Sequence, residues 1–225
     1  MDIIIGSGRL GSVLLEMISS ESVGIYSRNK HSVKNLLEQN RYVKECEKED
    51  LQKAKRLFLC LPKGEYESFF SEVNRWLPKK VHLYHFATAL KESEVRSLTD
   101  KGNVIPCKLV GHAKQMYEDK HGLFALPKHC SHVKSELEQL FPMIKIVTAS
   151  EEEALLANKK TTEAVLKMMV SLELELSNEG LSEEFVKQSL AQTVRGVAKS
   201  YLNGDLGGFA KQIIEDVKKR EAHEN

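Results

Sequence analysis

The chain of 225 residues has few of the features that mark membrane-spanning, secreted or nucleic-acid-binding proteins. It has only 4 cysteines and no Cys-x-x-Cys pair, so we expect reduced thiols. Apolar runs are short and broken by charges, which argues against a membrane-spanning helix. The net charge of +1 gives no overall field to recruit nucleic acid or a membrane. The first predicted strand begins at residue 2 and leaves no room for a signal peptide, so we expect a cytoplasmic protein.

The chain does have a glycine motif close to its start. Residues 2–5 predict a strand, residues 6–11 read Gly-Ser-Gly-Arg-Leu-Gly, and residues 9–19 carry apolar side chains at helical spacing. In this context the pattern Gly-x-Gly-x-x-Gly predicts a dinucleotide site. The first glycine allows a tight turn, the second lets the backbone approach a pyrophosphate, and the third lets the helix pack closely on the strand. The alternative is a surface glycine turn.

The end of the second predicted strand, residues 23–27, bears on which dinucleotide is bound. An NAD site usually has an Asp or Glu there to hold the ribose 2′-hydroxyl. Residues 26–30 read Tyr-Ser-Arg-Asn-Lys and contain no acid. Arg28 can pair with a 2′-phosphate through two N–H groups, and Ser27 and Asn29 can add hydrogen bonds, so NADP is favoured. The alternative is that Arg28 and Lys30 are solvated loop charges.

The predicted cofactor site draws on four segments: the glycine loop, the end of the second strand, the turn after residue 60 and the segment after a strand at residues 81–86. Its residues are Gly6, Ser7, Gly8, Arg9, Leu10, Gly11, Ser27, Arg28, Asn29, Leu61, Pro62, Lys63 and Ala87.

Strands and helices alternate over residues 1–148, which predicts a doubly wound α/β domain of the Rossmann type that binds NAD(P). The predicted strands are 2–5, 23–27, 41–43, 57–61, 81–86, 104–105, 122–126 and 144–147; the predicted helices are 9–19, 31–39, 65–77, 92–100 and 130–141. Residues 149–225 predict only helices, the first opened by a capping box at residues 150–153. Such helices alone make a thin core, so we expect this second domain to form a homodimer.

The layout resembles the pyrroline-5-carboxylate reductase family, within the wider group that includes β-hydroxyacid dehydrogenases. The resemblance rests on residues 5–11, 26–29 and 59–63 in the first half, and on residues 178–182 and 191–199 in the second. The most specific stretch is residues 191–199, Ala-Gln-Thr-Val-Arg-Gly-Val-Ala-Lys, which is similar to a helix of that family. The family implies an NAD(P)H-dependent reductase of a cyclic imine, with a dimer built by C-terminal helices.

The chain departs from the family in the segments that would hold the substrate. Residues 154–162 replace a Gly-Ser-Gly-Pro-Ala-Tyr-like loop, residues 204–209 lack the proline and both threonines of a Ser-Pro-Gly-Gly-Thr-Thr-like segment, and residues 104–108 replace a Met-Pro-Asn-x-Pro stretch. The sequence therefore predicts an NADP-dependent oxidoreductase that passes hydride to a small imine or a keto/hydroxy acid. The alternative is a catalytically divergent NADP-binding dimer that regulates or senses, like the late-competence relatives of the family.

Hydride transfer also needs a proton source near the carboxyl ends of the strands. The candidates are Lys108 and His112 after the strand at residues 104–105, and Thr161 and Thr162 on the first turns of the long helix. The alternative for the first pair is an exposed lysine and a polar-loop histidine. His85 ends a predicted strand and is as consistent with packing as with function.

Metal binding is not expected from the sequence. His112, His121, His129 and His132 lie near Cys130 along the chain, but their spacing matches no zinc motif.

Overall fold

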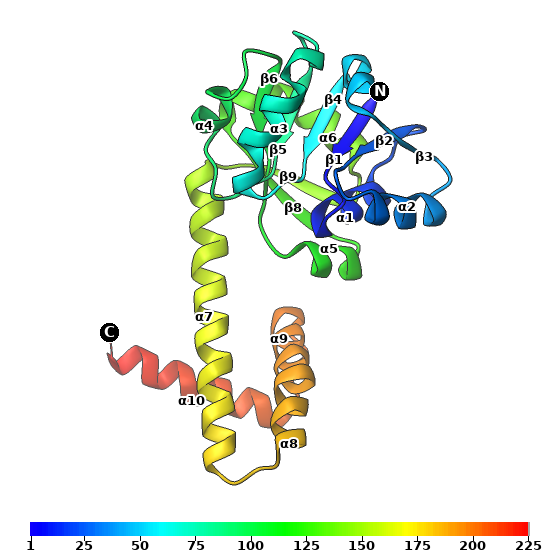
Figure 1. Cartoon of the computed structure of the whole chain (residues 1–225). Coiled ribbons are helices and arrows are strands. Elements are labelled where there is room, and N and C mark those ends of the chain that lie inside the picture. Colours follow the sequence, from blue (N-terminus) through cyan, green and yellow to red (C-terminus); the bar gives the residue numbers. More distant parts are fainter. Residues whose placement is uncertain (225) are drawn as a thin grey trace. The chain divides into compact units, whose positions relative to one another are not determined.

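The computed structural model describes residues 1–224, including the side chains of 1–220 and 222, and divides into two compact units. The first comprises residues 1–159 and the second starts at residue 160, within a long helix (Figure 1). The predicted domain boundary at residue 148 coincides with the end of the last strand, just before that helix begins.

The first unit is built on a six-stranded parallel sheet of order β3-β2-β1-β4-β5-β6. Its strands, in chain order, are β1 (Asp2–Ile5), β2 (Val23–Tyr26), β3 (Val43–Glu45), β4 (Arg56–Leu59), β5 (His82–His85) and β6 (Asn103–Pro106). The chain adds strands outward from β1 to β3 and then crosses back to place β4 on the other side of β1. This order confirms the predicted doubly wound fold.

A smaller sheet continues from the last strand of the large one. It has the order β7-β8-β9, with β7 (Lys108–Leu109) antiparallel to β8 (Gly122–Leu126) and β8 parallel to β9 (Ile144–Thr148). Only Cys107 separates β6 from β7, and its N–H donates to the carbonyl oxygen of His85 at 3.0 Å. One run of chain therefore belongs to both sheets.

Alternate residues of the central strands enter two separate cores. Ile4 and Phe58 pack with helices on one face, whereas Ile3 and Leu57 pack on the other. The first face carries α1 (Arg9–Met17), α2 (Lys30–Gln39), α5 (Ala113–Asp119) and α6 (Lys134–Leu140). The second carries α3 (Tyr66–Val73) and α4 (Glu92–Arg96). Helices on both faces explain why the strands are almost continuously apolar.

Several elements differ from those that the sequence predicts. The third strand lies at Val43–Glu45 rather than 41–43, and α4 ends at Arg96 rather than Asp100. The predicted helix 130–141 begins as a 3-10 helix, Lys128–Val133, and continues as α6. The sequence does not predict α5 or β7, which are too short to show a clear periodicity.

The second unit contains helices over its described residues. They are α7 (Glu151–Asn178), whose first turns belong to the first unit, then α8 (Glu183–Gln188), α9 (Val194–Asn203) and α10 (Gly208–Glu224). A π-helical segment, Ser189–Thr193, joins α8 to α9. The predicted capping box is confirmed, because the Glu153 N–H donates to Ser150 Oγ and the Ser150 N–H donates to Glu153 Oε2. Within the described chain, no helix is both long and apolar enough to cross a bilayer.

Candidate functional site

The glycine loop between β1 and α1 has a geometry that requires glycine at two positions. Gly6 has φ +99°, and a Cβ there would lie 2.7 Å from the carbonyl oxygen of Cys60. A Cβ on Gly11 would overlap the carbonyl oxygen of Gly6, so α1 packs against the loop only because this residue has no side chain. A Cβ on Gly8 would instead meet nothing within 4 Å. The open space therefore lies beside Gly8, where the motif places a pyrophosphate.

A pocket of about 490 Å³ opens beside this loop, at the carboxyl ends of β1, β2 and β4. The predicted cofactor residues that line it are Gly6, Ser7, Gly8, Ser27, Arg28, Asn29, Leu61 and Pro62. The sheet order reverses between β2-β1 and β1-β4, so the pocket lies at the topological switch point where open α/β sheets bind ligands. Its volume is in the range of small-molecule sites.

The remaining predicted cofactor residues lie around the pocket rather than in its lining. Arg9 borders a separate hollow, and Leu10 and Gly11 belong to the packing of α1. Lys63 Nζ donates to the carbonyl oxygen of Ala89 at 3.2 Å and pairs with Glu94 at 2.9 Å. The carbonyl oxygen of Ala87 accepts from Lys108 Nζ at 2.7 Å.

Serine and asparagine side chains hold the far rim of the pocket in place. Ser7 Oγ lies 2.9 Å from Ser27 Oγ and joins the glycine loop to the end of β2. Ser32 Oγ donates to the carbonyl oxygen of Ser7 at 3.1 Å, which links the same loop to α2. Asn29 caps α2, because its Oδ1 accepts from the Ser32 N–H at 3.0 Å. The loop that would face a ribose is thus fixed by hydrogen bonds before any ligand arrives.

Arg28 forms an ion pair with Glu65, which also lines the pocket. Both side chains are more than a third exposed, so water screens the pair. The sequence did not point to Glu65, since it lies 37 residues after Arg28, at the end of the 3-10 helix Lys63–Glu65. Lys30 is held elsewhere, by Glu45 and Glu47 at 2.7 Å each, and these two carboxylates raise its pKa. Arg28 is therefore the cation of this segment that lines the pocket.

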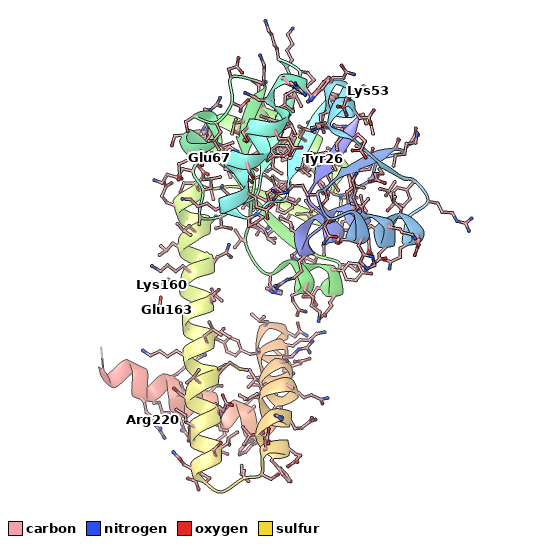
Figure 2. The ribbon with its side chains drawn as sticks, viewed as in Figure 1. Tyr26, Lys53, Glu67, Lys160, Glu163 and Arg220 are labelled. Atoms are coloured by element: carbon pink, nitrogen blue, oxygen red, sulfur yellow. The ribbon has the colours of Figure 1, made fainter. Side chains whose placement is uncertain are left out.

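Tyr26 lies at the end of β2 among the side chains of the first unit and also lines the pocket (Figure 2). Burial, followed by the charges of Glu72 and Glu47, raises the pKa of its hydroxyl. Glu72 is a second acid in the pocket lining.

Lys108 is fully buried, which rules out the alternative that it is an exposed lysine. Its Nζ donates to the carbonyl oxygens of Ala87 and Leu90 at 2.7 Å each and to His85 Nδ1 at 3.1 Å. An ammonium group has three donors, and these three acceptors use them all. The same Nζ lies 3.0 Å from Glu151 Oε2, at the start of α7. Lys108 thereby joins the loop after β5 to the first turn of α7.

Burial dominates the titration of this cluster. It lowers the pKa of Lys108, although the neighbouring Glu151 carboxylate opposes that shift. Burial and the charge of Lys108 lower the pKa of His85 to about 3. His85 is therefore neutral and accepts from Lys108 through Nδ1, with its remaining proton on Nε2. That nitrogen lies 3.8 Å from Glu151 Oε2, too far for a hydrogen bond.

The other predicted catalytic residues are exposed. His112 is exposed at the start of α5 and borders a hollow of about 190 Å³. Within the chain as described, no hydrogen bond joins it to Lys108. Thr161 and Thr162 are exposed on α7 in the second unit, between Lys160 and Glu163, whose side chains project from that helix in Figure 2.

No protein-family model matches the chain, and no curated protein sequence matches it. Solved structures match it over nearly its whole length. A pyrroline-5-carboxylate reductase from Coxiella burnetii is 13% identical with a TM-score of 0.67, covering 99% of this chain and 92% of that one. A pyrroline carboxylate reductase from Plasmodium falciparum, solved with NADP bound, is 16% identical with a TM-score of 0.63, covering 96% and 83%. An imine reductase from a Pseudomonas species is 15% identical with a TM-score of 0.64, covering 97% and 86%.

These likenesses show the fold, a Rossmann domain followed by a helical region, and the fold is one that NAD(P)-dependent reductases use.

Proposed function

We propose that the chain is an NADP-dependent oxidoreductase that passes hydride to a small imine or a keto/hydroxy acid. The observation that carries the proposal is the pocket at the switch point of the sheet, where Gly8 leaves open space and the rim is already hydrogen-bonded. A dinucleotide fits this donor set, since backbone N–H groups at the start of α1 favour phosphate. The solved structure with NADP bound has the same fold.

The preference for NADP rests on Arg28. A 2′-phosphate carries more charge than a carboxylate and offers three acceptor oxygens, so it would compete well with Glu65 for the guanidinium group. Ser27 and Asn29 lie beside Arg28 in the pocket lining. β2 itself ends in Tyr26, so no acid stands where an NAD site usually has one.

Nicotinamide chemistry would supply the hydride, and the protein has to position the acceptor and move a proton. In this proposal Lys108 is a positioning residue, because its donors hold the loop that contains Ala87. His112, Thr161 and Thr162 stay the candidates for substrate or proton contacts.

The cofactor proposal is tested by calorimetry with NADPH and NADH on the full chain. We expect NADPH to bind more tightly, and Arg28→Gln to remove most of that preference while leaving NADH binding unchanged. The matched control is Lys30→Gln, which removes a cation from the same segment but outside the pocket lining. Failure of both nucleotides to bind would overturn the proposal, and equal effects of the two variants would overturn the role of Arg28.

We further propose a homodimer through the helices of the second unit. Among the side chains described from residue 160 onward, only Val186 is buried. The large apolar side chains exposed there are Val165, Leu166, Met168, Val170, Leu174, Leu181, Phe185, Val197, Tyr201, Leu202, Phe209, Ile213 and Val217. A soluble monomer rarely exposes so many large apolar side chains, and helices without a core of their own gain one by pairing with a second copy.

One observation favours a second candidate function, an NADP-binding dimer that regulates or senses without turnover. Lys108 is the first candidate proton donor, but all three N–H groups of its ammonium group donate to acceptors within the protein. A screen of imines and keto acids, in which turnover is measured by the loss of NADPH absorbance, separates the two functions. Turnover that falls in His112→Ala supports the enzyme; tight NADPH binding with no turnover across the screen supports the regulator.

A further inference from the structure

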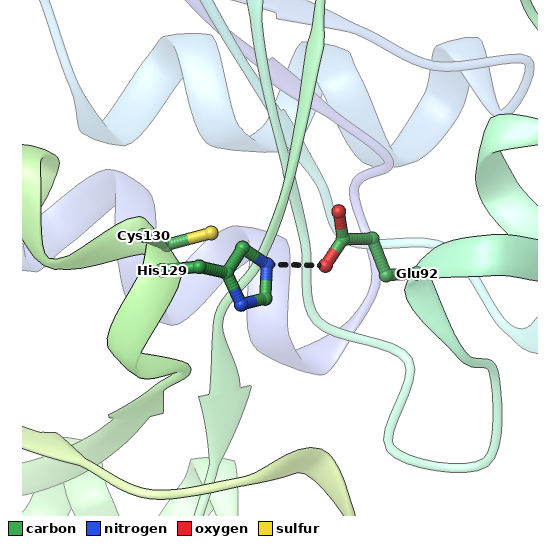
Figure 3. A group of neighbouring side chains, drawn as sticks. All are labelled: Glu92, His129 and Cys130. Carbon is green, nitrogen blue, oxygen red and sulfur yellow. Dashed lines mark hydrogen bonds and ion pairs between the residues drawn. The ribbon is translucent and has the colours of Figure 1, made fainter.

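Three side chains with metal-binding atoms meet outside the dinucleotide pocket (Figure 3). Glu92 is the first residue of α4, whereas His129 and Cys130 belong to the 3-10 helix after β8. A carboxylate oxygen, an imidazole nitrogen and the thiol sulfur all lie within 4.8 Å of one another. His129 Nε2 is 2.8 Å from Glu92 Oε2.

The distances between these three atoms are close to the distances between the ligand atoms around a bound cation. Zinc lies about 2.3 Å from sulfur and about 2.0–2.2 Å from nitrogen or oxygen, so its tetrahedral ligand atoms are about 3–4 Å apart. Glu92 Oε2 and His129 Nε2, at 2.8 Å, are slightly closer together than that, and all three ligand atoms lie within 4.8 Å of one another.

The three side chains of the cluster differ in their exposure to solvent. Cys130 is 2% exposed and packs in the core of the first unit, and the Glu92 side chain is 16% exposed. His129 is 61% exposed and faces the solvent. An ion would enter past the imidazole and keep a water as its fourth ligand, as zinc sites with three protein ligands do.

The position of Glu92 is fixed from three directions. Its Oε1 pairs with Arg96 at 2.7 Å, which leaves Oε2 for His129. Its N–H donates to Glu151 Oε1 at 2.9 Å. Glu151 also pairs with Lys108, so the cations and acids around the site are already matched. To bind a divalent ion, the Cys130 thiol would release its proton, because the thiolate is the form that ligates a metal.

We propose that Glu92, His129 and Cys130 form a binding site for a divalent cation of the zinc class. A mixed set of sulfur, nitrogen and oxygen ligands suits Zn²⁺, whereas Mg²⁺ and Ca²⁺ require oxygen ligands alone. The ion would join α4 to the segment after β8, one hydrogen bond away from the buried Lys108 cluster. Spacing along the chain could not reveal the site, because Glu92 precedes His129 by 37 residues.

The test uses Co²⁺ as a spectroscopic probe on the reduced full-length chain. We expect one equivalent to give the visible bands of a tetrahedral site together with a thiolate-to-cobalt charge-transfer band, and Zn²⁺ to displace it. Cys130→Ser should abolish the charge-transfer band, and His129→Ala should weaken binding at least tenfold, because each removes one of three protein ligands. His129 is exposed, so its variant keeps the fold.

Two controls match these variants. Cys46→Ser removes another buried thiol, and His132→Ala removes an exposed histidine from the same 3-10 helix. Both should leave the cobalt spectrum unchanged. The proposal is overturned if the wild-type chain gives no charge-transfer band, if the band persists in Cys130→Ser, or if the control variants lose it equally. These readouts do not depend on dinucleotide binding.

Discussion

The Arg28 guanidinium group pairs with the Glu65 carboxylate inside the lining of the glycine-loop pocket. A 2′-phosphate at this position has to take Arg28 from Glu65. The pair is partly exposed, and such pairs contribute at most about 1 kcal/mol. The free energy of this ion pair is small, but it is subtracted from the binding free energy of a ligand that has to break the pair.

We therefore expect Glu65→Gln to tighten NADPH binding by roughly two- to fivefold, since about 1 kcal/mol corresponds to about a fivefold change. NADH, which has no 2′-phosphate, should gain much less. Calorimetry with both nucleotides measures the difference, and Glu72→Gln removes another pocket acid that does not pair with Arg28. Weaker NADPH binding in Glu65→Gln would show that the carboxylate helps to hold the cofactor.

The glycine loop offers a variant that separates folding from binding. An alanine at Gly8 meets no atom within 4 Å, and the backbone there has φ −75°, which any residue adopts. Gly8→Ala should therefore fold with an unchanged melting temperature but bind NADPH at least tenfold more weakly, because its methyl group occupies the space beside the loop. Gly64→Ala is the matched control, since its Cβ also meets nothing and it lies outside the pocket lining. Unchanged binding in Gly8→Ala would place the phosphates elsewhere.

His85 makes stability depend on pH in a defined direction. Its pKa is lowered to about 3 in the folded chain from 6.5, so between these values the unfolded chain binds the extra proton. The stability that this shift of the His85 pKa provides is fully present above about pH 6.5 and is lost as the pH falls toward 3. In that range the free energy of unfolding changes by up to about 1.4 kcal/mol per pH unit. Urea unfolding between about pH 7 and pH 5, above the range of most carboxylates, measures it.

His85→Gln should flatten this slope, whereas His132→Gln, at an exposed position, should leave it intact. A slope that persists in His85→Gln would assign the acid sensitivity to another group.

The exposed apolar surface of the second unit predicts the oligomeric state. Leu166, Val170 and Leu174 recur every four residues along α7 and are 59%, 56% and 60% exposed. We expect the wild-type chain to sediment as a dimer and Leu166→Glu to weaken the dimer at least tenfold, because a buried carboxylate has no partner there. Lys167→Glu introduces the same side chain one position along, at an exposed residue, and should have little effect. A monomeric wild-type chain would contradict the proposed dimer.

The sequence predicted the parts of the pocket lining that depend on neighbours along the chain. Gly6 and Gly8 lie in the loop between β1 and α1, and Gly11 lies in the first turn of α1. The strand and the helix are regular, so the local fold of the motif could be read directly. Ser27, Arg28 and Asn29 follow β2 in the same way. The capping box at Ser150 is equally local.

The contacts that the sequence did not reveal join distant segments. Glu65 meets Arg28, and Glu92 meets His129, each across 37 residues, and no periodicity relates such positions. The burial of Lys108 depends on β7, whose two residues show no pattern of their own. Without such a pattern, a lysine is expected at the surface, because lysine side chains are seldom fully buried.

The single residue between β6 and β7 makes this stretch intolerant of length changes. Cys107 passes the chain from the large sheet to the small one, and the next residue, Lys108, is paired with Ala125. Successive side chains of a strand point to opposite faces, so inserting or deleting one residue here would turn the ammonium group away from His85 and bring a different side chain into its place. Length variation among relatives of this chain should therefore fall in its loops and spare residues 103–109, even where the side chains around them change.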